Sequence, residues 1–378
     1  MATQKNFLYY PFLKKELNYS LIEVFIPVGS AYEEKEIAGI SHLLEHLVGL
    51  RIKNLSSEFT KLGVYVNANT EYYFTRFYFS VLNANVKKTL NLLEKLFFEA
   101  DFSQEDLDKE KKLIKEEMFL KSREDLSYEK FFASIFKNTN LANPIIGYPS
   151  TIQNISLSLL KNWYKKFYTK PILISWGTEK FNSSFKGKID LRPPRIKMTS
   201  QSFIKIIKDD KESKNILLKA LILENNYDWK KRVLLELFAA ILSSTEISLL
   251  YQNIINPGLS YRCYSYCYHY NGLSLLLIYG ESKQIKKVDE ILENILLNFN
   301  QLITPELFHL IKSYYLNQYL LEEANGEIIY YLGREYCTFG CPFPFKDVLS
   351  FTEKIRYQDF MEFIQLILNK GIYKLMFI

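Results

Sequence analysis

Histidine and cysteine are both scarce in this chain, with four of each among 378 residues. The cysteines form two C-x3-C pairs, Cys263 with Cys267 and Cys337 with Cys341. Zinc knuckles usually use C-x2-C spacing, and a chain in a reducing compartment keeps its thiols reduced. A metal site or disulfides stay open as the alternative, but we expect four small, mostly buried apolar side chains.

Long uninterrupted apolar runs are also missing. The longest apolar region, "VLLELFAAILSSTEISLL", contains Glu236, Glu246 and a Ser-Ser-Thr cluster, which a membrane span does not readily accept. The start, "MATQKNFLYYPFLKKELNYS", lacks an apolar core followed by a small-residue cleavage site. The simplest expectation is a cytoplasmic chain that does not contact membranes.

Blocks of like charge are absent as well. The net charge of +6 comes from 48 basic and 42 acidic residues that are interspersed, so neither nucleic acid nor an anionic membrane is indicated as a partner. The aromatic run "YRCYSYCYHY" raises the alternative of an RNA-binding sheet. No RNA-recognition signature accompanies it, and a strand packed on both faces explains the same pattern.

The chain does contain an internal repetition. A strand pattern, "EYYFTRFYFSVL", is followed by two helical patterns, "NVKKTLNLLEKLFFEA" and "SQEDLDKEKKLIKEEMFL", the second with Ser103 as its N-cap. The same order returns about two hundred residues later as "GLSLLLIYG", "QIKKVDEILENILLNF" and "TPELFHLIKSYYLNQYL". The last of these begins with Thr304 as cap and Pro305 at the first helical position.

Such repetition predicts two copies of one α+β domain, each a mostly antiparallel sheet with helices packed on one face. A length of 378 residues with 48% hydrophobic content also favours two domains. Glycine, proline and mixed charge interrupt the apolar pattern in "FNSSFKGKIDLRPPRIKMTSQS". We therefore place the boundary near residue 190 and expect domains at 1–190 and 191–378.

Two of the four histidines stand in "GISHLLEHLVGL". On a helix, His42 and His46 share a face because they are four residues apart, and Glu45 lies nearly on the same side. The pattern H-x-x-E-H is the mirror of the H-E-x-x-H zinc motif. Zinc accepts two imidazoles and a carboxylate and keeps a fourth position for water. The alternative is a pair of half-exposed helix histidines.

A third ligand is expected on the second long helix, which carries Glu110, Glu116 and Glu117. Glu110 and Glu117 are two helical turns apart and share a face, whereas Glu116 points about a quarter-turn away. One of the aligned pair is then a candidate ligand and the other a supporting acid. The alternative is a solvated, charge-rich helix face.

The segments "PVGSAYEEKEIAGISHLLEH", "VNANTEYYF" and "DKEKKLIKEEM" resemble the N-terminal catalytic domain of M16 metallopeptidases, the family of pitrilysin, insulinase and mitochondrial processing peptidase. The resemblance is ordered over residues 17–120 and continues more weakly to "SLLYQNIINPGLSY" and "LLLIYGES". It implies one zinc per chain. The roles that it implies are zinc ligation by His42, His46 and Glu117, general base catalysis by Glu45, support by Glu110, and pairing with substrate backbone by Asn67 and Ala68.

The resemblance also implies a duplicated fold whose second copy binds no metal, since that copy lacks H-x-x-E-H and has no acid at residues 316–318. The activity it implies is hydrolysis of extended peptides or small unfolded polypeptides by a zinc-dependent endopeptidase, with ribosomally made peptides among the substrates of bacterial members. The alternative is a non-catalytic scaffolding subunit, although such relatives tend to lose the zinc residues.

One feature departs from the family pattern. Relatives carry an arginine seven residues before the tyrosine of "GLxY", and the two residues help to fix the substrate. Tyr261 matches the tyrosine, so the resemblance implies that it binds substrate, but the position seven residues earlier is Ile254. Arg262 is adjacent, yet on a strand it faces the opposite way. Complete M16 enzymes enclose substrate between two double-domain halves, so the resemblance implies a dimer. The missing arginine favours a heterodimer with a homologous subunit, and a homodimer stays open.

Overall fold

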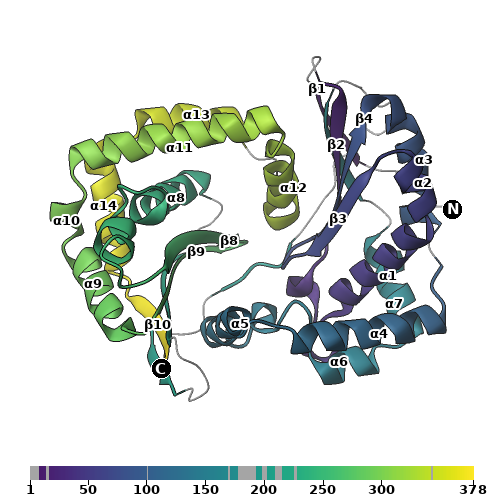
Figure 1. The fold of residues 1–378 in the computed structure, drawn as a ribbon, viewed down its shortest axis with the longest axis horizontal. Coiled ribbons are helices and arrows are strands. Elements are labelled where there is room, and N and C mark those ends of the chain that lie inside the picture. The colour runs from purple at the N-terminus through teal and green to yellow at the C-terminus, as the bar shows by residue number, and fades with distance from the viewer. Residues whose placement is uncertain are drawn as a thin grey trace. The chain divides into compact units, whose positions relative to one another are not determined.

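The computed structural model describes residues 8–13, 17–99, 101–168, 171–177, 193–197, 202–208, 215–224, 228–341 and 344–378 (Figure 1). The strands are β1 Leu8–Leu13, β2 Tyr19–Ile26, β3 Tyr65–Thr70, β4 Thr75–Leu82, β5 Ile172–Gly177, β6 Ile204–Ile207, β7 Asn215–Glu224, β8 Arg262–Tyr270, β9 Leu273–Ser282 and β10 Ile372–Phe377.

The α-helices are α1 Ile40–Asn54, α2 Ser56–Lys61, α3 Val86–Phe98, α4 Gln104–Phe119, α5 Arg123–Ile135, α6 Pro149–Asn154, α7 Leu157–Phe167, α8 Trp229–Ser243, α9 Ile285–Leu297, α10 Phe299–Leu302, α11 Pro305–Asn325, α12 Ile328–Phe339, α13 Phe345–Lys354 and α14 Tyr357–Leu368. Short 3₁₀ turns cover Ser30–Tyr32, Lys35–Ile37, Asn83–Asn85 and Asn140–Ala142, and a π-helical turn covers Tyr251–Ile255.

Two sheets of the same construction confirm the predicted duplication. Within the described residues, the strand orders are β1-β5-β2-β4-β3 and β6-β10-β7-β9-β8. The outermost pairs β1–β5 and β6–β10 are parallel, and the remaining pairs are antiparallel. Each strand of the first sheet therefore has a counterpart at the same place in the second. The fold is α+β and mostly antiparallel, as the repeated strand and helix patterns predict.

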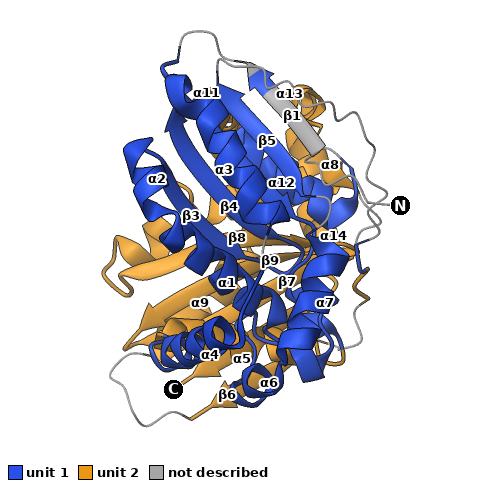
Figure 2. Cartoon of the chain, turned by 90° about the vertical axis from the view of Figure 1, so that its right-hand side faces the viewer, with its two compact units in different colours: residues 1–121, 139–194, 325–343 blue, residues 122–138, 195–324, 344–378 orange. Residues whose placement is uncertain are grey.

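The chain forms two compact units that are not continuous in sequence (Figure 2). Unit 1 consists of residues 1–121, 139–194 and 325–343, and unit 2 of residues 122–138, 195–324 and 344–378. Helix α5 thus belongs with the second sheet and α12 with the first. The predicted boundary at 190/191 lies outside the described residues and stays a prediction.

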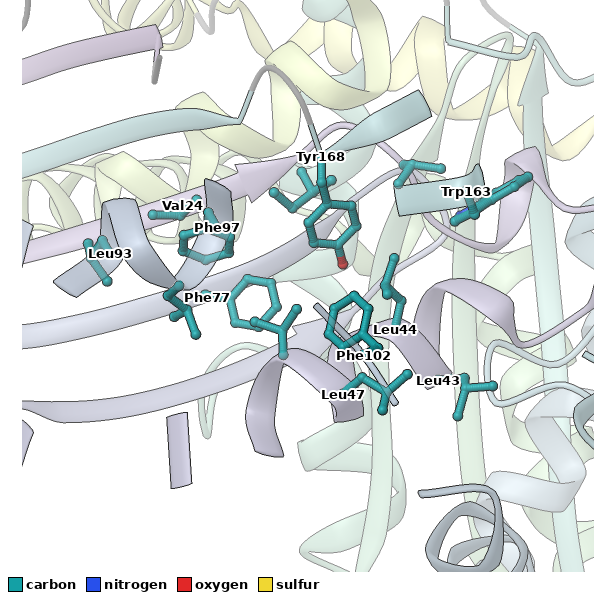
Figure 3. Packing of buried hydrophobic residues seen from close by; sticks show 14 of the residues in the cluster. Val24, Leu43, Leu44, Leu47, Phe77, Leu93, Phe97, Phe102, Trp163 and Tyr168 are labelled. Carbon is teal, nitrogen blue, oxygen red and sulfur yellow. The ribbon is translucent and has the colours of Figure 1, made fainter. Parts of the chain in front are cut away.

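The core of unit 1 lies between the sheet and its helices (Figure 3). Alternate residues of β2 and β4, among them Val24 and Phe77, face Leu44 and Leu47 of α1 and Phe97 of α3. The rings of Phe77 and Phe97 pack edge to face with centroids 5.1 Å apart. Each fully buried side chain of this size contributes about 1.5–3 kcal/mol to folding. This packing fixes the position of α1 on the sheet.

The opposite face of the same sheet carries α12, a layer that the sequence analysis did not predict. Phe25 of β2 points to this face because it alternates with core residue Val24, and it is fully buried. A Cβ built on Gly333 of α12 would lie only 2.1 Å from the Phe25 ring. A glycine at position 333 therefore allows the helix to lie close to β2.

Helix caps follow the sequence expectations. The Ser103 side chain accepts a hydrogen bond from the Asp106 backbone N–H, and the Asp106 carboxylate accepts one from the Ser103 N–H. Helix α11 begins at Pro305, and the Thr304 hydroxyl accepts from the Leu307 N–H at 3.2 Å. These caps satisfy backbone donors that a helix start otherwise leaves unpaired. The predicted start of the glutamate-bearing helix α4 is confirmed.

The four cysteines are free thiols, and Cys263 and Cys337 are buried. Burial raises the pKa of the Cys263 thiol to about 12, which keeps it protonated and unreactive. No described helix combines the length and the apolar composition that a membrane span requires. The cytoplasmic location expected from the sequence stays a prediction.

Two glycine-to-alanine substitutions in helices should have opposite effects on stability. Gly333→Ala should lower the free energy of unfolding by about 1–3 kcal/mol, because the new methyl group overlaps the buried Phe25 ring. Gly49→Ala in α1 is the matched control: an added Cβ meets nothing within 4 Å, so better helix propensity should stabilise the protein by about 0.5–1 kcal/mol. Urea unfolding measures both. Equal stability of the two variants would contradict the close packing of α12 on β2.

Candidate metal centre

The start of α1 is held by a buried carboxylate. Glu33 accepts hydrogen bonds from the backbone N–H groups of Gly39 at 2.6 Å and Ser41 at 2.8 Å. Burial raises the pKa of Glu33 to about 7, even though these hydrogen bonds favour its charged form. Gly39 has a φ of 95°, and a Cβ there would lie 2.6 Å from the Ile146 carbonyl oxygen. The first turn of α1 is therefore fixed just before the two histidines.

His42 and His46 lie side by side on α1, with ring centroids 4.7 Å apart. The Nε2 atoms of both rings face the Glu117 carboxylate on α4, His42 at 3.8 Å and His46 at 3.3 Å. One ligand atom from each of the three residues lies within 4.8 Å of the others. Two imidazole nitrogens and one carboxylate oxygen, partly open to solvent, fit the donor set of a catalytic zinc.

Glu110 lies behind His46, one face-repeat before Glu117 on α4. Its carboxylate is 3.1 Å from His46 Nδ1, and its side chain is only 3% exposed. A metal-bound histidine commonly donates its second ring N–H to a carboxylate, which fixes the tautomer and the ring orientation. Glu110 is placed for that role, with the His46 Nε2 turned toward Glu117.

The two imidazoles have pKa values that diverge. Burial, reinforced by the neighbouring His46, lowers the pKa of His42 to about 4. Burial opposes the charged form of His46 too, but hydrogen bonds to Glu110 and Glu117 outweigh it and raise the pKa of His46 to about 9. His46 in turn lowers the pKa of Glu117. Without a metal, the carboxylates of Glu110 and Glu117 therefore keep His46 protonated. A metal cation bound by the same residues would take over the role of that proton.

Glu45 follows His42 on α1 and contacts the end of β3. The Thr70 hydroxyl donates a hydrogen bond to Glu45 Oε2 at 2.5 Å. Burial raises the pKa of Glu45 above its ordinary value, and the Thr70 hydrogen bond works against that rise. Glu116 is exposed and takes no part in the ligand cluster. The position of Glu116 therefore agrees with the predicted quarter-turn that separates it from Glu110 and Glu117 on α4.

Asn67 and Ala68 lie in β3, which is the edge strand of the first sheet within the described part of the chain. The Asn67 Oδ1 accepts a hydrogen bond from the Ala68 backbone N–H at 2.8 Å. A ladder N–H would be committed to β4, so this one faces the open edge of the sheet. Backbone groups of β3 are therefore available to a further strand.

Tyr261 belongs to unit 2 and is 94% exposed. The Arg262 guanidinium is not free to replace the missing arginine, because it pairs with Glu124 at 2.6 Å and with Glu281 at 3.5 Å, both in unit 2. The substrate-binding role expected for Tyr261 stays a prediction.

The second copy has a counterpart to the contact between Thr70 and Glu45. Thr70 pairs with Thr75 across β3 and β4, and His269 pairs with Ser274 across β8 and β9. Thr75 and Ser274 stand at the same distance along the chain from the helices that follow, α3 and α9. Thr70 and His269 therefore occupy matching positions in the two sheets.

The partner of His269 is Glu236 of α8, with His269 Nε2 2.8 Å from Glu236 Oε1. Glu236 thus stands where Glu45 stands in the first copy. Aligned on these two glutamates, "HLLEH" of α1 becomes "VLLEL" of α8, with buried Val233 and Leu237 in place of the histidines. A search of the sequence for histidine pairs does not reveal this equivalence, because the second copy has none. The retained glutamate in "VLLEL" was the signal that could have shown it.

Two family models match most of the chain. A model described as insulinase (peptidase family M16) matches residues 14–148, and one described as peptidase M16 inactive domain matches residues 174–315. An uncharacterized zinc protease of Rickettsia felis is 26% identical over 369 residues, 89% of this chain and 87% of that protein. A probable mitochondrial-processing peptidase subunit beta of Arabidopsis thaliana is 27% identical over 155 residues, 39% of this chain and 29% of that protein.

The fold agrees with a solved structure. A protease from Helicobacter pylori has a TM-score of 0.87 to this chain at 18% identity, and the match covers 100% of this chain and 98% of that one.

Zinc binding should release at least one proton at pH 7. His46 is protonated below its pKa of about 9 and must lose that proton to bind metal, whereas His42, with a pKa of about 4, is already neutral. The contribution of His46 should fall toward zero as the pH rises through 9, and only the proton of water ionised by zinc would then still be released. Calorimetric titrations with zinc in buffers of different ionisation heat measure the number of protons released.

Glu110→Gln should reduce this proton release and weaken zinc binding about 10–100-fold, because the acceptor that supports His46 is lost. Glu116→Gln, on the same helix but pointing away, is the control and should behave as wild type. Equal zinc affinity of the two variants would contradict the supporting role of Glu110.

Proposed function

Because the chain belongs to peptidase family M16, we propose that it is a zinc-dependent endopeptidase that hydrolyses extended peptides or small unfolded polypeptides. The observation that carries this proposal is the approach of His42, His46 and Glu117 to one another, with Glu45 next to them on α1. The zinc protease name of the Rickettsia relative supports the same reading.

Each residue of the cluster has a proposed task. His42, His46 and Glu117 hold one zinc ion per chain, which when bound supplies Lewis acidity and makes water ionise near neutral pH. Glu110 orients the His46 ring. Glu45 takes the proton from the attacking water and delivers it to the leaving amine nitrogen, as a general base that becomes a general acid. The raised pKa of Glu45 suits this exchange, because a carboxylate of ordinary acidity is a weaker proton acceptor.

Substrate is proposed to bind along β3 as an added strand. The Ala68 N–H faces the open edge, and an extended peptide would pair with β3 through main-chain hydrogen bonds that tolerate many side chains. The Asn67 side chain, which now accepts from that N–H, would then be released toward the peptide. Because Thr70 ends β3 and holds Glu45, a peptide on this edge is led toward the catalytic carboxylate.

A homologous partner completes the proposal. The Arabidopsis relative is named as the beta subunit of a peptidase. This chain also lacks the arginine that usually accompanies Tyr261. Both points favour pairing with a second M16 subunit that supplies substrate contacts, with a homodimer as the other form.

Glu45→Gln should keep zinc and lose activity. The amide has the shape of the carboxylate but accepts no proton, so peptide turnover should fall by about 10²–10⁴-fold while zinc stays near one per chain. Cleavage of a quenched-fluorescent peptide library, with metal content measured in parallel, makes the test. Glu34→Gln, an exposed acid outside the cluster, is the control and should retain full activity.

Two results would oppose the proposal in different ways. Absence of zinc from wild-type protein purified without chelators would exclude a zinc peptidase. Bound zinc without turnover, in the presence of every homologous subunit of the host, would instead favour the alternative of a non-catalytic scaffolding subunit.

The partner proposal has its own measurement. Light scattering on the chain purified from its native host should give a mass near or above twice 44.7 kDa, with either a second copy or a homologous subunit in the particle. Added homologous subunit should raise peptide turnover by the chain if the partner supplies substrate contacts. A fully active particle of 44.7 kDa would refute the need for a partner.

A further inference from the structure

A cavity of about 360 Å³ lies in unit 1, on the face of the sheet opposite the ligand cluster of His42, His46 and Glu117. Its floor is formed by β2 and β4 and its roof by the first turn of α12 and the two residues before it. Cavities of 300–1,000 Å³ with a few convergent polar groups are the usual setting of ligand sites. The proposed peptidase mechanism makes no use of this one.

Arg76 of β4 is the central polar group of the cavity. Its Nε donates to Glu23 Oε2 at 2.9 Å, and its Nη2 donates to Glu23 Oε1. Glu23 is buried, with 5% of its surface exposed. The rings of Tyr78 and Tyr330 flank the guanidinium, each with its centroid 4.5 Å from Cζ. The guanidinium is therefore held along one edge and packed against two rings.

The other edge of this guanidinium is open. Glu23 occupies the edge formed by Nε and Nη2, and the polar contacts of Arg76 with other described residues involve these two nitrogens and not Nη1. A guanidinium presents a second pair of parallel N–H groups along the edge from Nη1 to Nη2, and this geometry matches a carboxylate. Arg76 is thus a preorganised receptor for a further pair of oxygen atoms.

Two more donors stand in the same row. Arg76, Tyr78 and Ser80 alternate along β4 with the core residues Phe77 and Phe79, so their side chains share the cavity face. For the Tyr78 and Ser80 hydroxyls, too, the described part of the chain provides no hydrogen-bond partner. One strand therefore offers three neighbouring donor groups to the cavity.

The charge and the walls of the cavity limit which class of ligand can bind there. Glu23 balances the charge of Arg76, and Arg334, which lies over the rings of Tyr330 and Tyr331, is paired with Glu335. Exposed Glu327 adds a negative charge at the rim, so a dianion such as phosphate is disfavoured relative to a monoanion. Tyr78, Tyr330 and Tyr331 supply aromatic walls beside the donors. The matching ligand is a single carboxylate attached to an aromatic or aliphatic body.

We propose that this cavity is a binding site for a peptide carboxylate, received by the open edge of Arg76 with help from Tyr78 and Ser80. The carboxylate comes either from a peptide C-terminus or from an acidic side chain. This site does not depend on the proposed peptidase activity, because none of its residues belongs to the metal cluster.

Calorimetric titration with matched probes tests the site. N-acetylphenylalanine should bind the zinc-loaded wild-type protein, and its amide should not, if a C-terminal carboxylate is the ligand. N-acetyl-Phe-Glu-amide should bind better than N-acetyl-Phe-Gln-amide if an acidic side chain is the ligand. Either preference supports the proposal, and the pair that shows it identifies the source. No preference within either pair would overturn it.

Variants locate the binding. Tyr78→Phe and Ser80→Ala each remove one donor to a charged group and should weaken the preferred probe about tenfold or more. Arg76→Lys should weaken it further, because an ammonium lacks the two parallel N–H groups. Tyr314→Phe is the control: Tyr314 is 37% exposed on α11, outside the cavity lining, and its substitution should change nothing.

A carboxylate bound to zinc instead would give a different pattern. Glu117→Gln would then abolish probe binding, and Tyr78→Phe would leave it unchanged; that outcome overturns the proposal. Circular dichroism and zinc content confirm that each variant is folded. If Arg76→Lys fails to fold because Glu23 loses its partner, the hydroxyl variants still decide the question.

Discussion

The hydrogen bond between buried Glu110 and His46 is the interaction on which the rest of the site depends. A carboxylate with a 3% exposed side chain needs a positive or donating partner, and the His46 ring supplies it from the neighbouring helix. This contact joins α1 to α4, turns the second nitrogen of His46 toward Glu117, and brings His42 Nε2 to the same carboxylate. The charge balance is completed only by a cation. In the metal-free chain that cation is a proton on His46, because hydrogen bonds to Glu110 and Glu117 raise the pKa of His46 against the effect of burial. Burial, reinforced by the charge on His46, lowers the pKa of His42.

The second copy of the fold shows which side chains occupy the same positions when no cation is needed to balance the charge. Val233 and Leu237 of α8 stand where the histidines stand on α1, and both are buried as ordinary core residues. Glu236 remains, but its carboxylate accepts hydrogen bonds from the hydroxyls of Tyr315 and Tyr319 and contacts His269. Two tyrosine hydroxyls and the His269 ring therefore satisfy in the second copy a glutamate that in the first lies beside His42, His46 and Glu117. One backbone arrangement thus accommodates either a cation site or a tyrosine network, depending on a few side chains.

Much of this organisation could be predicted from sequence, because it rests on local spacing. The four-residue step from His42 to His46 and the seven-residue step from Glu110 to Glu117 place side chains on single helix faces, and the two helices then need only pack together. The strand and helix patterns predicted the repeated α+β units for the same reason. Two features depend on residues far apart in the chain and were beyond such reasoning. These are the packing of α12 on β2 and the pairing of Arg76 with Glu23. The equivalence of Glu236 with Glu45 did leave a local signal, the glutamate of "VLLEL", but a search for histidine pairs does not find it.

The first sheet separates two kinds of chemistry by the alternation of its strands. Residues Phe77, Phe79 and Val81 of β4 face α1 and α3 and are apolar and buried. Their packing positions α1, which carries His42 and His46. Residues between them, Arg76, Tyr78 and Ser80, face the other side and remain partly exposed. A peptide added to the edge of β3 would continue this alternation, since its successive side chains would also point to opposite faces. On the face of Arg76 its neighbours would be Tyr65, Asn67 and Asn69, and on the other face the residues that approach Glu45. Sequence preference in such a peptide would therefore have a period of two, with one set of positions read by the catalytic face and the other by the polar face.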